Sequence, residues 1–106
     1  MLKIDSALVS KTNKLVDYQK GSIVSREIIS KSSGTITAFA FDTGQSLSAH
    51  KAPFDAVVHI LDGQAEIMIG DETFELVSGE MIVLPIDVMH SLKAIKRFKM
   101  LLIMIR

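Results

Sequence analysis

The chain of 106 residues contains no cysteine and no tryptophan, has only two prolines, and carries no net formal charge. The absence of cysteine excludes disulfides, thiolate nucleophiles and cysteine-ligated metals. It is compatible with a reducing compartment, so we expect a cytoplasmic protein. Twelve basic residues balance twelve acidic ones. This balance removes the electrostatic reason to expect nucleic acid or an anionic membrane surface as a partner.

Long apolar runs are also missing. The longest lies near the C-terminus, at residues 100–105, and is far too short to span a bilayer. No run of signal-peptide length stands at the N-terminus. Hydrophobic residues nevertheless make up 48% of the chain, which is enough for one packed core at this length. We expect an N-terminal arm at residues 1–14 and a single domain at residues 15–106.

After the arm, nearly all of the sequence consists of short apolar or alternating segments divided by turn residues. Asp62-Gly63 and Gly70-Asp71 have the composition of tight hairpin turns. No convincing helix is present, and about nine or ten short strands predict an all-β sandwich or a small jelly-roll barrel. The expected strands are residues 15–18, 23–30, 35–41, 47–50, 56–61, 65–69, 73–77, 81–84, 91–95 and 98–105.

Two separated stretches carry glycine, a proline-containing turn and histidine at regular spacing. Residues 44–63 and 79–90 resemble the two signature motifs of the cupin superfamily, and the resemblance extends over residues 35 to about 105. It implies a small single-domain cupin of the type-2 conserved barrel kind. The fold would be an all-β, cupin-like jelly-roll β-barrel, also described as a double-stranded β-helix. The matching framework positions are Gly44, His50, Gly63, Gly79, Pro85 and His90.

The departures from the family pattern concern the metal ligands. In cupins two histidines and a glutamate of the first motif, with one histidine of the second, usually bind one divalent metal. Here Ala52 stands at the second histidine position and Ala56 at the glutamate position, so only His50 and His90 remain. Two further framework positions also differ, Asp87 for a glycine and Ala94 for an asparagine.

Two histidines leave most of a coordination shell to water. We therefore expect a divalent ion (zinc, iron, manganese or nickel) to be weakly held or absent. Asp55 is the nearest carboxylate, one residue before the lost glutamate position. In a regular strand it would point to the opposite face, whereas a bulge could turn it back, so it remains a candidate ligand. His59 is expected to face away from the cavity.

The resemblance implies a small-molecule-binding barrel with a partly lost metal site, and this is the preferred interpretation. The alternative is a metal-dependent cupin enzyme, a dioxygenase or isomerase acting on a small polar substrate. It would use His50 and His90, with Asp55 or water completing the shell. A third interpretation is a sensory or accessory domain. No catalytic residue can be assigned, and the sequence does not decide whether the protein is an enzyme.

Two expectations concern the surface. Small cupins usually pair as dimers by adding an edge strand of one barrel to the sheet of the other. Several strands here look apolar on both faces, which favours a homodimer. A late group of basic residues is expected to lie on a solvated hairpin. Its members are Lys93, Lys96, Arg97 and Lys99.

Overall fold

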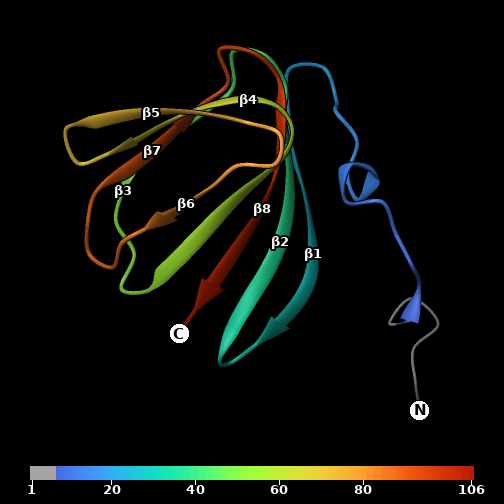
Figure 1. Cartoon of the computed structure of the whole chain (residues 1–106), viewed down its shortest axis with the longest axis horizontal. Coiled ribbons are helices and arrows are strands. Elements are labelled where there is room, and N and C mark those ends of the chain that lie inside the picture. The colour runs from blue at the N-terminus through green and yellow to red at the C-terminus, as the bar shows by residue number, and fades with distance from the viewer. Residues whose placement is uncertain (1–6) are drawn as a thin grey trace.

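The computed structural model describes residues 7–106 as a curled antiparallel arrangement of eight strands (Figure 1). The all-β barrel expected from the sequence is confirmed, with fewer and longer strands. Within the described residues no helix is long and apolar enough to cross a membrane. A 3₁₀ helix, η2 (Thr12–Lys14), precedes the strands. These are β1 (Ile23–Lys31), β2 (Gly34–Phe41), β3 (Ser46–His50), β4 (Asp55–Ile69), β5 (Glu72–Val77), β6 (Met81–Leu84), β7 (His90–Lys93) and β8 (Phe98–Ile105).

Strand β4 joins the two sheets of the barrel. Its first half pairs with β8 and β6, and its second half pairs with β5 and β7. The first sheet therefore runs β1-β2-β8-β4-β6, and the second sheet runs β3-β7-β4-β5. In Figure 1 the strands β3, β5 and β7 of the second sheet lie on the left, and the strands β1, β2 and β8 of the first sheet lie further to the right. Among the strands of residues 7–106, β5 and β6 each pair with β4 alone.

The hairpin turn expected at Asp62-Gly63 is wrong, because β4 continues through both residues. The register of β4 against β8 instead shifts between Ile60 and Asp62, which leaves Leu61 as the extra residue of a β-bulge. Gly63 still pairs with β8 and Gln64 pairs with β5, so the bulge lies next to the point where β4 passes from one sheet to the other. An Asp-Gly pair suits both a hairpin turn and a β-bulge, and only the partner strand distinguishes the two.

Gly63 is required at this bend for two reasons. Its φ is +75°, in the left-handed region that residues with a Cβ rarely adopt. A Cβ there would also lie inside contact distance of the Arg97 carbonyl oxygen. By contrast, the turn expected at Gly70-Asp71 is confirmed between β4 and β5.

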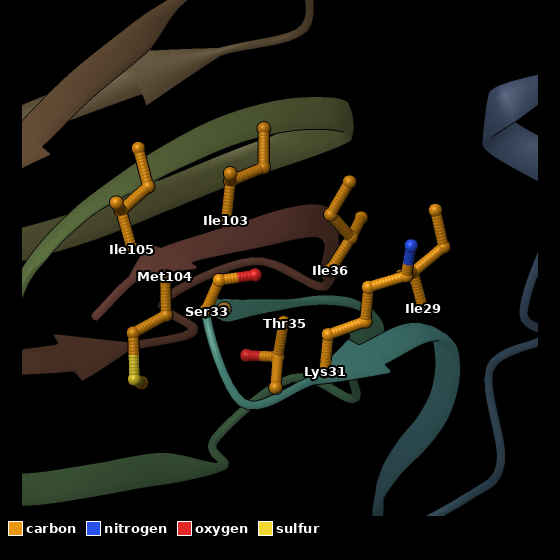
Figure 2. A pocket seen from close by; sticks show the side chains of 9 residues that line it. Ile29, Lys31, Ser33, Thr35, Ile36, Ile103, Met104 and Ile105 are labelled. Atoms are coloured by element: carbon orange, nitrogen blue, oxygen red, sulfur yellow. The ribbon is translucent and has the colours of Figure 1, made fainter.

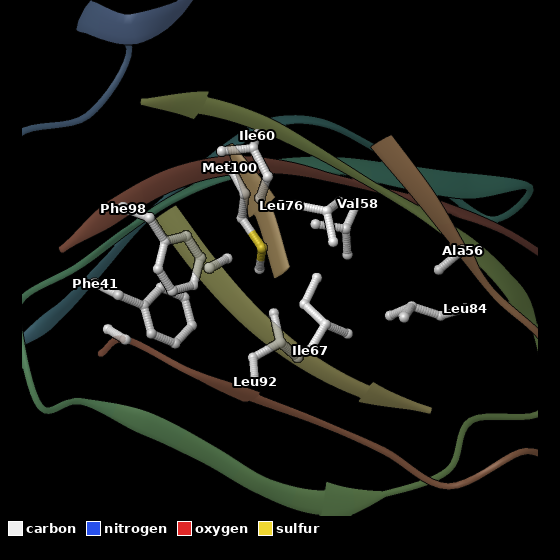
Figure 3. Close-up of a cluster of buried hydrophobic side chains, with 12 residues drawn as sticks. Phe41, Ala56, Val58, Ile60, Ile67, Leu76, Leu84, Leu92, Phe98 and Met100 are labelled. Carbon is white, nitrogen blue, oxygen red and sulfur yellow. The ribbon is translucent and has the colours of Figure 1, made fainter. Parts of the chain in front are cut away.

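The core lies between the two sheets. Burial alternates along β4, as expected for a strand with one inner face. The rings of Phe41 and Phe98 stack with their centroids 4.5 Å apart. Figure 3 shows these rings beside apolar side chains that converge from both sheets. The largest fully buried side chains are Phe41, Phe98, Ile60, Ile67, Met100 and Val58.

Residues 15–18, expected as a strand, form none and instead pack on the outer face of the first sheet. Val16 is buried there against Ala38 and Ala40. The Tyr18 hydroxyl donates a hydrogen bond to Asp62 Oδ2 at 2.6 Å. Burial and this hydrogen bond raise the pKa of Tyr18 above its usual range. The segment is thus attached to the barrel by one apolar and one polar anchor.

Lys99 departs from the expected solvated position, because only 8% of it is exposed. Its Nζ donates to the Asn13 carbonyl oxygen at 2.6 Å and lies 4.9 Å from the centroid of the Tyr18 ring. The Arg97 guanidinium lies 4.5 Å from the same centroid. Two of the late basic residues therefore hold the N-terminal segment on the sheet. Of the expected arm, residues 1–6 lie outside the described residues.

Candidate functional site

His90 begins β7, and its side chain lies on the inner face of the barrel. Burial alternates along β7 from His90 to Leu92, and His90 pairs with the inward Ile69 of β4. Only 7% of His90 is exposed. A turn at residues 85–88 delivers it, in which Asp87 adopts a φ of +59°. The family pattern has glycine at this position, and the left-handed backbone explains why.

His50 ends β3 and meets His90 across the β3–β7 pairing. The register shifts between Leu47 and His50, so that His50 is the partner of His90. Their Nε2 atoms lie 3.2 Å apart. The ring centroids lie 4.4 Å apart, with the planes at 69°. His50 is exposed, whereas His90 is buried, so the pair runs from the mouth of the barrel to its interior.

The other nitrogen of each ring contacts the backbone. His50 Nδ1 lies 2.8 Å from the Ser48 carbonyl oxygen, and His90 Nδ1 lies 3.3 Å from that of Val88. A carbonyl oxygen can only accept, so each of these contacts is a hydrogen bond in the tautomer that carries its hydrogen on Nδ1. In the neutral state both Nε2 atoms then present lone pairs to each other. Such a pair is stabilised by one shared proton, a ligand hydrogen-bond donor or a cation.

The surroundings of His90 favour its neutral form. Burial lowers the pKa of His90 below its usual value, and the neighbouring His50 lowers it further. The hydrogen bond to the Val88 carbonyl opposes these two effects. A neutral His90 keeps its Nε2 lone pair, which is the form that accepts a hydrogen bond or binds a metal.

The geometry of the pair fits two ligands of one metal ion, but the donor set is incomplete. Metal–nitrogen bonds of about 2.0–2.1 Å place two nitrogens on one ion about 3.0–3.4 Å apart, and the observed separation is 3.2 Å. Within residues 7–106, however, no group of three or more histidine, cysteine, aspartate or glutamate side chains could hold a metal ion. His50 and His90 could hold an ion only with water in the remaining positions, where it would serve as a Lewis acid.

Asp55 begins β4 and is not brought to the histidine pair. Its carboxylate Oδ1 accepts a hydrogen bond from the Ile86 backbone N–H at 2.8 Å. A second contact joins the same two loops, because the Asp87 N–H donates to the Ala52 carbonyl oxygen at 2.9 Å. Asp55 therefore fastens the turn that precedes His90. Sequence reasoning missed this role, since its partner lies 31 residues away.

The remaining motif positions follow the expected faces. Ala56, at the glutamate position of the family, is 7% exposed and pairs with Leu84. A methyl group thus occupies the core where the carboxylate ligand would lie. His59 lies on the opposite face of β4 from Ala56 and Val58, away from the barrel interior as the alternation predicts.

A groove of about 630 Å³ opens between β5 and β6. Ile69 lines it and is the direct strand partner of His90, with both side chains on the inner face. Neither histidine is among the lining residues, and the groove is connected to His90 through this strand pairing. Its lining is largely apolar, with two carboxylates. The sequence offered only the alternation of apolar residues as a signal for these positions, which are Ile69, Asp71, Glu72, Phe74, Ile82, Val83 and Pro85.

Over residues 34–105 the sequence matches the family model described as the AraC-like ligand binding domain. No curated protein matches the chain. Among solved structures, a conserved protein of unknown function from Streptococcus pyogenes is 36% identical, with a TM-score of 0.92 over 97% of this chain and 90% of that one.

Two structural relatives are described as cupins. A cupin 2 conserved barrel domain protein from Leptotrichia buccalis is 40% identical, with a TM-score of 0.83 over 86% of this chain. This chain spans only 44% of that protein's length. A cupin superfamily protein from Desulfitobacterium hafniense is 25% identical, with a TM-score of 0.89 over 93% of this chain and 91% of that one. The chain therefore belongs to the family of AraC-like ligand binding domains and is a small cupin-type barrel.

Proposed function

We propose that the protein binds a small molecule at the His50–His90 pair. The observation that carries this proposal is the convergence of two Nε2 atoms at 3.2 Å, each on a ring anchored through Nδ1. The pair can accept hydrogen bonds, and Ile69, the strand partner of His90, lines a largely apolar groove. A ligand with a small apolar body and a hydroxyl group or another donor matches both features. The ligand-binding description of the matched family supports the same class of function.

In this proposal a divalent ion (zinc, iron, manganese or nickel) is weakly held or not held at all. Two imidazoles fall one ligand short of the three that catalytic zinc sites take from the protein. Asp55 contributes indirectly, by holding the turn beside His90. The small molecule, rather than a resident metal, is then the principal occupant of the site.

Calorimetric titration with a panel of small phenols and alcohols tests this proposal, after treatment of the protein with a chelator. His90→Leu removes the buried Nε2 and keeps an apolar side chain, and it should abolish binding. His59→Leu makes the same change on the opposite face of β4 and should leave binding intact. Equal binding by the wild type and His90→Leu would contradict the proposal.

A metal-dependent enzyme is the second candidate, favoured by the nitrogen separation that suits two ligands of one ion. Mass spectrometry of the purified protein under native conditions discriminates the two. One equivalent of metal that disappears in His50→Ala would favour the enzyme. A protein that stays metal-free in excess zinc, iron, manganese and nickel would leave this candidate without its Lewis acid.

A further inference from the structure

One row of paired residues crosses the second sheet from β3 to β5. His50 pairs with His90, and His90 pairs with Ile69 of β4. Ile69 pairs in turn with Glu72, the first residue of β5. Residues that pair directly across antiparallel strands share a face of the sheet, so Glu72 lies on the inner face with Ile69 and His90. The row therefore begins at the histidine pair and ends at a carboxylate.

Burial along β5 agrees with this placement of Glu72. Leu76 is 5% exposed, Phe74 is half-buried against the core, and Glu72 is exposed. Residues two apart in a strand share a face, so the three side chains follow one another along the inner face towards solvent. Glu72 therefore lies where the inner face of the second sheet becomes accessible to a ligand.

The groove between β5 and β6 contains this end of the row. Ile69 and Glu72 both line it, and the two charged residues of its lining, Asp71 and Glu72, are both acidic. The other lining residues are apolar. Its volume of about 630 Å³ lies in the range of small-molecule sites, which combine an apolar lining with a few polar groups. Two carboxylates in such a lining favour a ligand that carries a positive charge.

The charge of this groove differs from that of the hollow on the outer face of the first sheet. Figure 2 shows that hollow, which has a volume of about 200 Å³ and a lining that includes Ile29, Ile36 and Ile103. Lys31 is the charged residue of its lining. The outer hollow therefore repels a cation, whereas the groove attracts one.

We propose that the ligand of the histidine pair is an organic cation. Its ammonium or guanidinium group binds the carboxylates of the groove, while its hydroxyl group donates a hydrogen bond to the histidines. This inference rests on the proposed function and deepens it by assigning the charge of the ligand. Asp71 and Glu72 bind the cation, and Ile69 contacts the apolar body between the two ends of the ligand.

The register also limits the length of the ligand. Two strand spacings of about 4.8 Å separate the backbone of His90 from that of Glu72. The contact between the two histidines lies on the far side of His90, so roughly 10–14 Å separates the acceptor nitrogens from the Glu72 carboxylate. Two hydrogen bonds of about 2.8 Å leave roughly 4–8 Å between the hydroxyl and the cation of the ligand. One aromatic ring with a short side chain has this size.

Calorimetric titration of the chelator-treated protein with three phenols of similar size tests the inference. Tyramine carries an ammonium group, para-ethylphenol is uncharged, and para-hydroxyphenylpropionate carries a carboxylate. The wild type should bind tyramine about fivefold more tightly than para-ethylphenol, because an exposed ion pair contributes little free energy. It should bind the propionate most weakly. Glu72→Gln should reduce the affinity for tyramine to that for para-ethylphenol.

Glu75→Gln is the matched control, since it makes the same change on the same strand. Glu75 lies on the opposite face of β5, where it pairs with Glu66 and accepts a hydrogen bond from Gln64. This variant should keep the preference for tyramine. Circular dichroism verifies that each variant is folded.

The outcomes separate this inference from the proposed function. Tyramine bound no more tightly than para-ethylphenol by the wild type would overturn the inference, as would a preference that survives in Glu72→Gln. The proposed function would still stand if binding of para-ethylphenol were lost in His90→Leu. Conversely, a preference for tyramine that requires Glu72 and persists in His90→Leu would support the cation site in the groove and contradict the proposed function.

Discussion

The Nε2 atoms of His50 and His90 face each other at 3.2 Å, while the Nδ1 atom of each ring contacts the carbonyl of the residue two positions earlier. The backbone contacts fix the rings before any ligand arrives. They also leave two lone pairs directed at one point, an arrangement that gains free energy from a proton, a donor or a cation. The pair is therefore a preorganised acceptor, in a barrel that has lost the other ligands of a metal site.

Restoring one lost ligand should strengthen metal binding. Ala52→His places an imidazole at the second histidine position, on a backbone already tied to Asp87. With His50 and His90 it completes the three protein ligands typical of catalytic zinc sites. We expect zinc affinity at least about tenfold tighter than in the wild type. Competition against a chromogenic chelator measures it. Lys51→His is the control, and equal affinities in the two variants would contradict the prediction.

Stability should fall as the pH drops below the usual histidine value. Burial lowers the pKa of His90 in the folded protein, whereas in the unfolded chain it returns to about 6.5. Between these two values the unfolded chain binds the additional proton, so acidification favours unfolding. The contribution of His90 to the free energy of unfolding is therefore complete above pH 6.5. It is lost as the pH falls from 6.5 to the pKa of His90 in the folded protein. Urea unfolding with a chelator present measures the slope, which His90→Leu should flatten. An equal dependence of the unfolding free energy on pH in the wild type and in His90→Leu would contradict the prediction.

The contact between Asp55 and Ile86 should stabilise the turn before His90. Asp55→Ala removes the acceptor from an N–H that the carboxylate now binds at 2.8 Å. We expect it to lower the free energy of unfolding by about 1 kcal/mol. Asp55→Asn keeps an oxygen acceptor and should lose less. Denaturant titration compares them, and equal losses in both variants would show that charge, not the hydrogen bond, matters.

The Tyr18 hydroxyl should anchor the N-terminal segment. Tyr18→Phe removes the donor to Asp62 and retains the ring beneath Arg97 and Lys99. We expect a loss of about 1 kcal/mol in the free energy of unfolding, with faster hydrogen exchange at residues 15–18. Asp62→Asn still accepts a hydrogen bond and should cost less. Unchanged exchange in Tyr18→Phe would indicate that Val16 alone holds the segment.

Gly63 should resist substitution more than a glycine in open space. Gly63→Ala introduces both a strained φ and a clash with the Arg97 carbonyl, which together should cost at least about 2 kcal/mol. Gly79 has a φ of +91° but no atom within 4 Å of an added Cβ. Gly79→Ala should therefore cost only about 1 kcal/mol. Thermal and urea unfolding give both values, and equal costs would remove the clash from the explanation.

The local alternation of apolar residues and the flanking turn residues were sufficient to predict the bounds of β6 and β8. They were insufficient for β4, because an Asp-Gly pair suits a hairpin equally well as a bulge. The choice depends on the pairing of β4 with β8, which lies far along the chain. The meeting of His50 with His90 followed from the family resemblance. The partner of Asp55 and the burial of Lys99 depend on contacts between distant segments, which no local pattern contains.

Because β4 belongs to both sheets, neither sheet can be completed before this strand is in place. Most of its partner strands come from distant parts of the chain. The entropy cost of closing these loops must therefore be met before the strand contacts stabilise the fold. We therefore expect slow, single-exponential refolding, in milliseconds to seconds. A chain cut inside β4 should yield two fragments that fold only when mixed.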